Sequence, residues 1–240
     1  MTGMINFPAR IQACLQAEGS LKLLNTYRGI PIQYPGEIVG ISDHSLAVKV
    51  HKHQAVCLAL QQYTYLKCGQ SLLFFAEVIK GEIERQHFTL AAFQEADESI
   101  GNRETIRVHP KSPLPVILTN FRAEKSIASE LIDLSINGLG VYGLSVTLTD
   151  IQAFAENTQI NARLILPDGL SGEAASQEID IRGTIINRFP DQTQKRFRLG
   201  VRLAPDFEQQ AVISTYISRR QTEIISEIRR LYQSLVNMSA

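Results

Sequence analysis

The stretch ELIDLSINGLGV, residues 130–141, places two β-type runs on either side of a polar turn, and it is the part of the sequence that decides the fold. Ser, Asn and Gly are residues with which chains reverse direction between strands. A second stretch, EIVGISDHSLAV at residues 37–48, aligns with it without a gap, and the apolar positions coincide except where Asp43 aligns with Ile136. In that copy Gly40 replaces Asp133 and Ser45 replaces Gly138, so the strand pattern repeats while the carboxylate and the glycine of the second copy do not. Two such units also resemble each other by pattern alone, so we infer two β-rich halves without claiming common descent.

Short alternating or β-branched runs separated by turn residues continue through both halves. A closed barrel suits such a set of strands because it leaves no exposed edge. The sequence therefore predicts a mainly β protein with two small six-stranded β-barrels of the split or Greek-key type, joined by a linker. The expected strands are residues 30–34, 37–41, 46–50, 63–67, 72–80 and 87–93 in the first half, and 112–119, 129–134, 140–147, 162–166, 179–186 and 196–203 in the second.

Helices are expected at both ends of the chain. Residues 7–24 are predicted to form a short leading helix. A long C-terminal α-helix is predicted from Phe207, after the N-cap Asp206, to about Val236. Its length of about 45 Å exceeds what one small barrel can cover. The helix therefore either packs across the barrels of its own chain or forms a subunit interface. Its apolar stripe consists of Ile213, Ile217, Ile224, Ile228, Leu231 and Leu235.

A polar stretch without strand or helix period separates the two halves near residues 94–102. We accordingly expect a first domain at residues 1–95, a linker at 96–111 and a second domain at 112–240. The linker contains Arg103, Arg107, His109 and Lys111 against Glu104, which makes it locally basic.

Composition limits the function classes. Acidic and basic residues balance at 24 each, so no overall field attracts nucleic acid or anionic lipid. The N-terminus lacks a basic start followed by an apolar run, and no long uncharged apolar run occurs, so we expect no membrane insertion and a cytoplasmic location. Three cysteines without Cys-x-x-Cys spacing indicate neither a disulfide framework nor a zinc site.

Two polar motifs follow each other in the sequence. Arg103 and Arg107 form Arg-x-x-x-Arg in the linker, and Asp133, Ser135 and Gly138 form Asp-x-Ser-x-x-Gly. Guanidinium groups bind phosphate and stack on flat rings, whereas a carboxylate, a hydroxyl and an unhindered glycine suit the edge of a purine. Alone, the second motif also fits an ordinary turn between strands.

Taken together, the two motifs resemble the signatures of the PilZ family of cyclic di-GMP receptors, over roughly the second half of the chain. The first half more weakly resembles the N-terminal domain of flagellar-brake PilZ proteins. The resemblance implies that Arg103 and Arg107 bind the phosphates and a guanine of cyclic di-GMP. It also implies that Asp133 and Ser135 contact a guanine edge and that Gly138 lets the backbone approach. Asn102 stands where some members have a further arginine, which favours one bound molecule over a stacked pair.

In this family, ligand binding changes the orientation of the domains and regulates flagellar motility, biofilm formation or exopolysaccharide production. The resemblance therefore implies a bacterial signalling protein that is not an enzyme and needs no cofactor. Its partners would be cyclic di-GMP and an unidentified protein target such as a flagellar motor component, with a homo-oligomer through the C-terminal helix as a further expectation. The alternative is a PilZ-like adaptor that acts only through protein contacts and binds no ligand.

Other patterns point to no further chemistry. The run Gly138–Gly143 matches Gly-x-Gly-x-x-Gly, but it continues as a strand, so a dinucleotide site is not expected. His51 and His53 are interpreted as solvated strand residues, with no carboxylate or cysteine at metal-ligand spacing. Arg198 and Arg202 repeat the arginine spacing inside an alternating run, where we interpret them as part of a solvated strand face. No hydrolase, kinase or metalloprotease motif occurs.

Overall fold

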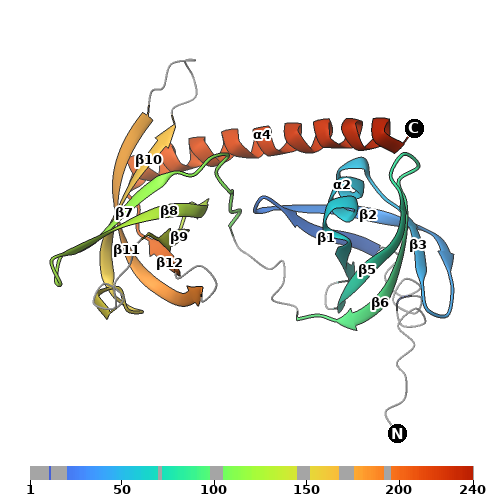
Figure 1. Cartoon of the computed structure of the whole chain (residues 1–240), viewed down its shortest axis with the longest axis horizontal. Helices are drawn as coiled ribbons and strands as arrows, with labels where there is room; N and C mark the ends of the chain where they lie inside the picture. Colours follow the sequence, from blue (N-terminus) through green and yellow to red (C-terminus); the bar gives the residue numbers. More distant parts are fainter. Residues whose placement is uncertain are drawn as a thin grey trace, which may run out of the picture. The chain divides into compact units, whose positions relative to one another are not determined.

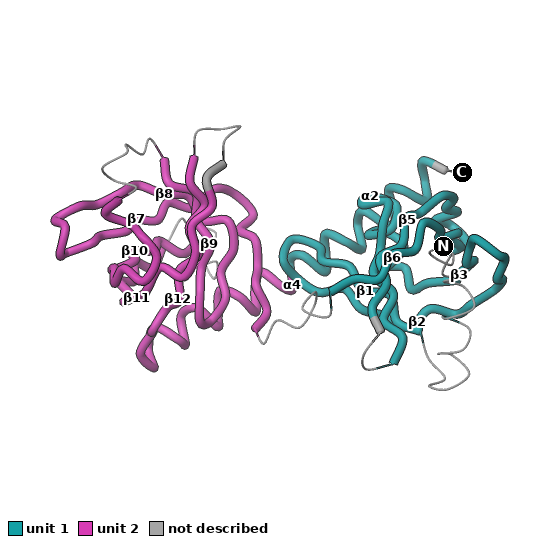
Figure 2. Tube along the Cα trace, turned by 90° about the horizontal axis from the view of Figure 1, so that it is seen from below, with its two compact units in different colours: residues 1–104, 223–240 teal, residues 105–222 magenta. Residues whose placement is uncertain are grey.

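The computed structural model contains two compact units (Figure 2). The first unit comprises residues 1–104 and 223–240, and the second comprises residues 105–222. The residues that the structure describes are 11, 21–69, 72–97, 105–144, 152–167, 176–191 and 196–239.

The first unit contains a closed antiparallel barrel in the order β1-β2-β3-β6-β5-β4 (Figure 1). Side chains alternate between core and surface along its strands, as the burial pattern of β4 shows, so each strand contributes one face to the core. The strands are β1 Leu21–Tyr27, β2 Ile30–Ile41, β3 Leu46–Lys49, β4 Tyr63–Cys68, β5 Leu72–Glu82 and β6 His87–Glu95.

The second unit contains a closed antiparallel barrel in the order β10-β11-β12-β9-β8-β7. Numbered within each unit, both barrels have the same circular order, 1-2-3-6-5-4. The prediction of two six-stranded barrels is therefore confirmed. The strands are β7 Pro115–Asn120, β8 Lys125–Ser135, β9 Gly138–Gly143, β10 Gln159–Pro167, β11 Ser176–Asp191 and β12 Arg196–Leu203.

Two local predictions for the first unit are wrong. The end of the predicted leading helix, from Leu21, is strand β1, which pairs with β2 and β4. The predicted strands 30–34 and 37–41 are one continuous strand, β2. Gly36 lies where a Cβ would fall 2.3 Å from the side chain of Leu23, so the strand passes this point only because residue 36 has no side chain. The count of six was correct because these two errors compensate.

Helix α2, Lys52–Gln61, was not predicted. It contacts β1, β2, β4, β5 and β6 and so closes one end of the first barrel (Figure 1). His51 is its N-cap and His53 is buried within it, so the interpretation of both as solvated strand residues is wrong. Six consecutive residues from His53 to Leu58 are buried, which removes the one-sided period that a sequence pattern detects.

Polar side chains of β1, β4 and α2 are bonded to one another inside the first barrel. Asn25 Nδ2 donates to Tyr63 O at 2.8 Å, and Thr64 Oγ1 donates to Asn25 Oδ1 at 2.8 Å. Gln54 Nε2 also donates to Asn25 Oδ1. These bonds offset the cost of burying amide and hydroxyl groups among apolar residues. The network therefore has a structural explanation.

The cysteines of the first unit differ from each other. Cys57 is buried with a free thiol, and burial raises its pKa to about 12, which makes it a poor nucleophile. Cys68 is disulfide-bonded, so the expectation that the cysteines form no disulfide is wrong for this residue.

Helix α4, Phe207–Ser239, begins where the sequence predicted. Asp206 and Gln209 form a reciprocal capping box, in which each backbone N–H donates to the other's side chain, at 3.0 and 2.9 Å. Ile213 and Ile217 are buried in the second unit, whereas Ile224 and Ile228 belong to the part of the helix assigned to the first unit. Of the two interpretations of the apolar stripe, packing within the chain accounts for these four residues. Among the described residues, no helix combines the length and apolar character needed to span a bilayer.

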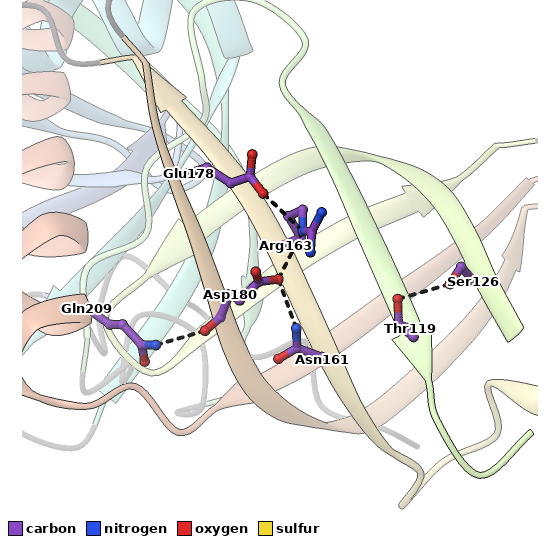
Figure 3. A network of polar contacts seen from close by, with 7 residues as sticks. All are labelled: Thr119, Ser126, Asn161, Arg163, Glu178, Asp180 and Gln209. Atoms are coloured by element: carbon purple, nitrogen blue, oxygen red, sulfur yellow. Dashed lines mark hydrogen bonds and ion pairs between the residues drawn. The ribbon is translucent and has the colours of Figure 1, made fainter. Parts of the chain in front are cut away.

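Polar contacts on the outside of the second barrel hold the start of α4 (Figure 3). Arg163 lies 3.1 Å from both Glu178 and Asp180, and Asn161 donates to Asp180 at 2.9 Å. Gln209 of α4 donates to the backbone carbonyl of Asp180 at 2.8 Å. The charge of Arg163 is compensated by the two carboxylates within this cluster. The hydrogen bond from Gln209 joins α4 to β11.

Candidate functional site

The polar residues of the second motif lie on the hairpin β8–β9. A β-bulge between Leu131 and Asp133 interrupts the pairing, after which Asp133 pairs with Gly140. A bulge turns the side chains that follow it relative to the strand before it. The carboxylate of Asp133 consequently lies over β9, because a Cβ on Gly140 would be 3.1 Å from its Oδ2 atom. Only a glycine at position 140 leaves this space open.

Asp133 is buried, and each of its carboxylate oxygens faces a different arginine. Arg107 Nη1 lies 3.2 Å from Oδ1, and Arg198 Nη2 lies 3.3 Å from Oδ2. The Asp133 side chain is 6% exposed, against 31% for Arg107 and 45% for Arg198. A buried carboxylate is costly unless it is paired, and the two guanidinium groups compensate its charge. The site is thus a buried anion under two accessible cations.

The segment that carries Arg107 is attached to the barrel next to Asp133. Val108 exchanges both backbone hydrogen bonds with Leu134, at 2.9 and 3.0 Å. One residue further, His109 O accepts from Arg220 Nε of α4 at 2.9 Å. Arg107 therefore directly precedes two anchored residues, and these place its backbone beside Asp133.

Ser135 and Gly138 close the hairpin turn. Ser135 is 1% exposed, and its Oγ donates to Gly138 O at 3.1 Å. A Cβ on Gly138 would lie 2.9 Å from Val201 O, so the close approach of β12 requires a glycine here. Both residues thus have a role in the turn, as the alternative interpretation of the motif expected, and both lie beside Asp133 on the same hairpin.

The structure brings together four of the five predicted site residues, namely Arg107, Asp133, Ser135 and Gly138. Arg103 lies outside the described residues.

Sequence reasoning missed Arg198. The strand face of Arg198 is solvated, as interpreted, but the side chain also pairs with an aspartate 65 residues away, which the sequence did not reveal. The only available signal was that Arg198 shares an outward face with Gly200, whose missing side chain leaves space beside it.

The arrangement offers hydrogen-bond donors of positive charge and an acceptor of negative charge at one accessible corner. The described site residues include no histidine or thiol, and no group of three metal-ligating side chains occurs among the described residues. The chemistry of the site is that of binding a ligand that carries both anionic groups and hydrogen-bond donors.

No family model matches the sequence, and no curated protein matches it. Among solved structures, the chain is similar to the Bacillus subtilis inhibitor of motility MotI/DgrA, at 13% identity, over 85% of this chain and 96% of that one, with a TM-score of 0.42. It is also similar to Escherichia coli YcgR in complex with c-di-GMP, at 14% identity, over 93% and 95% of the two chains, with a TM-score of 0.41.

A third similar structure is the PilZ domain of Escherichia coli YcgR with c-di-GMP, at 14% identity. The match covers 52% of this chain and 96% of that one, with a TM-score of 0.38. The solved structures to which this chain is similar thus include a PilZ domain, the family that the two motifs resemble.

Proposed function

We propose that the protein is a receptor for cyclic di-GMP that binds the nucleotide at the Asp133 corner of the second barrel. The observation that carries this proposal is the contact between Arg107 and Asp133 at 3.2 Å. It joins the two motifs, which are 26 residues apart in the sequence, into one site.

Each residue has a proposed role that its chemistry supports. Arg107, together with Arg103, binds phosphate oxygens and stacks on a guanine, since a guanidinium is planar and always charged. Asp133 accepts hydrogen bonds from the N–H groups of a guanine edge. Ser135 adds a hydroxyl contact, and Gly138 lets the ligand approach the backbone. No cofactor is proposed.

The anchored backbone lowers the entropic cost of this binding. Fixing one flexible residue costs about 1–2 kcal/mol, and the bridge between Val108 and Leu134 has already met that cost for the segment next to Arg107. A charge-assisted hydrogen bond contributes about 1.5–3 kcal/mol. A few such bonds support micromolar or tighter affinity.

The proposed output is a change in domain orientation. Ligand contacts to Arg103 and Arg107 fix the part of the linker, residues 96–111, that precedes the anchored Val108 against the second domain, residues 112–240, and this alters how the first domain, residues 1–95, is presented to a protein target. We propose that the protein acts in the bacterial cytoplasm, without turnover of the nucleotide. The regulated processes are motility, biofilm formation or exopolysaccharide production, and a flagellar motor component is the proposed target.

One observation favours the alternative function, a ligand-independent adaptor. Both carboxylate oxygens of Asp133 are paired with arginines of the same chain, so the charge of Asp133 is compensated without a ligand. In an adaptor these ion pairs would only join the Arg107 segment and β12 to β8.

Calorimetry of the full chain with cyclic di-GMP, followed by chromatography of the recovered nucleotide, separates the functions. A receptor gives saturable heat and returns the nucleotide intact. An adaptor gives no binding heat, and an enzyme returns hydrolysed nucleotide.

The variant Arg107→Ala tests the site itself. It is expected to weaken binding about 100-fold, because it removes charge-assisted bonds to the ligand. The matched control is Arg182→Ala, which removes an exposed arginine from the outer face of β11 and should bind like the unaltered chain. Equal affinity of the two variants would place the ligand elsewhere. A large fall in the melting temperature of Arg107→Ala, without a similar fall for Arg182→Ala, would mean that Arg107 is structural.

The proposed homo-oligomer needs a surface other than the buried isoleucines of α4. Light scattering of the full chain with and without cyclic di-GMP measures the mass directly. A monomer mass in both conditions would contradict the oligomer.

A further inference from the structure

Four positions form a row across the outer face of the second barrel. Asp133 on β8 pairs with Gly140 on β9, Gly140 pairs with Gly200 on β12, and Gly200 pairs with Asn187 on β11. The two middle positions have no side chains, and the two ends have polar ones. We call these four residues the glycine row.

Polar side chains lie over the two glycines. A Cβ on Gly140 would be 3.1 Å from Asp133 Oδ2, and a Cβ on Gly200 would be 2.2 Å from Asn187 Oδ1. The carboxylate and the amide therefore lean inward from opposite ends of the row. Arg198 starts from β12, two residues before Gly200, and reaches Asp133 at 3.3 Å. These groups have rotatable side chains, so a flat ring can displace them without disturbing the apolar core.

The pair formed by Asp133 and Arg198 presents a hydrogen-bond acceptor next to a donor. The edge of guanine has the complementary order, with N1–H and N2–H donors beside the O6 and N7 acceptors. A guanidinium is a strong partner for O6 and N7. Adenine carries an N6 amino donor at the place of O6, so the same arginine would there face another donor. The order of acceptor and donor over the glycine row thus complements the edge of guanine, whereas adenine would place a donor against a donor.

We infer that Arg198 is a specificity-determining residue, which donates to O6 and N7 of a guanine whose N1–H and N2–H groups bind Asp133. This inference rests on the proposed function. Binding exchanges the direct contact between Arg198 and Asp133 for contacts of each with the base. Arg107 keeps its contact with Oδ1 of Asp133, and its other N–H groups remain available for phosphate.

The test compares the full-length chain with Arg198→Met, a neutral substitution of similar length, by calorimetry with cyclic di-GMP and with cyclic di-AMP. We expect Arg198→Met to weaken cyclic di-GMP binding about tenfold or more, and to change cyclic di-AMP binding less than twofold. Arg198→Lys, which keeps the charge without the fork, should bind cyclic di-GMP with intermediate affinity. Arg182→Ala is the control for loss of a positive charge on the same barrel. Arg198→Ala repeats the measurement if the methionine variant melts early.

Two results overturn the inference while leaving the receptor in place. One is unchanged cyclic di-GMP affinity of Arg198→Met alongside a clear loss in Arg107→Ala, and the other is an equal loss for both dinucleotides. If the unaltered chain binds no cyclic di-GMP at all, the proposed function and this inference fail together.

Discussion

The two barrels of this chain are built alike, position by position, around the row that carries the site. In the first barrel Gly40 pairs with Ala47 after a bulge that follows Ile38, and in the second Asp133 pairs with Gly140 after a bulge that follows Leu131. The sequence alignment of residues 37–48 with 130–141 therefore corresponds to equivalent places in space.

The equivalence continues across the next strands. Ala47 pairs with Thr89, and Thr89 pairs with Lys80 after a bulge in β5. The first barrel thus has Gly40, Ala47, Thr89 and Lys80 where the second has the glycine row of Asp133, Gly140, Gly200 and Asn187. The acid is missing, and side chains occupy the two central positions. Both barrels and their bulges thus form the same row of positions, and the side chains at these positions decide whether a charged polar site is present.

The largest expected effect comes from giving the second barrel the residues of the first. The double variant Asp133→Gly with Gly140→Ala removes the carboxylate and fills the space above β9. It should weaken cyclic di-GMP binding at least about 100-fold while the barrel still folds. Calorimetry and thermal unfolding measure the two parts of this prediction. Retained affinity in a folded double variant would show that the row is not the binding place.

An intermediate effect should come from helix α2 of the first unit. Burial lowers the pKa of His53 to about 4, from an ordinary value near 6.5, with smaller contributions from His51, Lys52 and Arg229. The unfolded chain therefore binds a proton more readily than the folded one, and stability is lost as the pH falls from about 6.5 towards 4. Lowering the pH from 7.5 to 5 should cost the first unit about 2 kcal/mol through this residue.

Denaturant unfolding at the two pH values, combined with hydrogen exchange resolved by unit, measures this loss. His53→Gln should flatten the pH dependence. The control His44→Gln alters an exposed histidine and should leave it unchanged. A loss of equal size in both units would assign the acid sensitivity to other groups.

The smallest expected effect is in the reverse exchange, Gly40→Asp. A Cβ at position 40 would meet Ala47 at an ordinary 3.7 Å, so the aspartate fits. The position equivalent to Arg198 is His87, which supplies no permanent positive charge, and Ala47 still fills the row. Calorimetry should therefore show an unchanged number of ligands per chain. A second binding event would mean that a carboxylate alone converts the barrel into a receptor.

The sequence predicted those parts of the structure that depend on local patterns. The strands of the second barrel and the start of α4 follow from alternation, turn residues and an N-cap, and each lies within a few residues of its predicted place. Helix α2 was missed because burial on all sides removes its helical period. Strand β1 was taken for a helix because an apolar run such as Leu21–Leu24 fits either structure without its partners.

The residues of the candidate site also divide into those that local patterns predict and those that depend on strand pairing. Arg107, Asp133, Ser135 and Gly138 could be named because their spacing forms two motifs. Arg198 could not, because its role depends on the pairing of β12 with β9 and on the absence of a side chain at Gly140. Each of these facts concerns strands that are distant in the sequence, so no pattern within a single strand reveals them.

The backbone bridge between Val108 and Leu134 has a kinetic consequence. In the proposed receptor, a nucleotide that reaches the second barrel meets the Arg107 guanidinium already in place, so binding does not wait for that part of the chain to close. The association rate is then set by diffusional encounter, and substitutions at Arg107 or Asp133 act chiefly by shortening the lifetime of the complex. The proposed receptor thus releases the nucleotide at a rate set by a few side chains at one barrel corner.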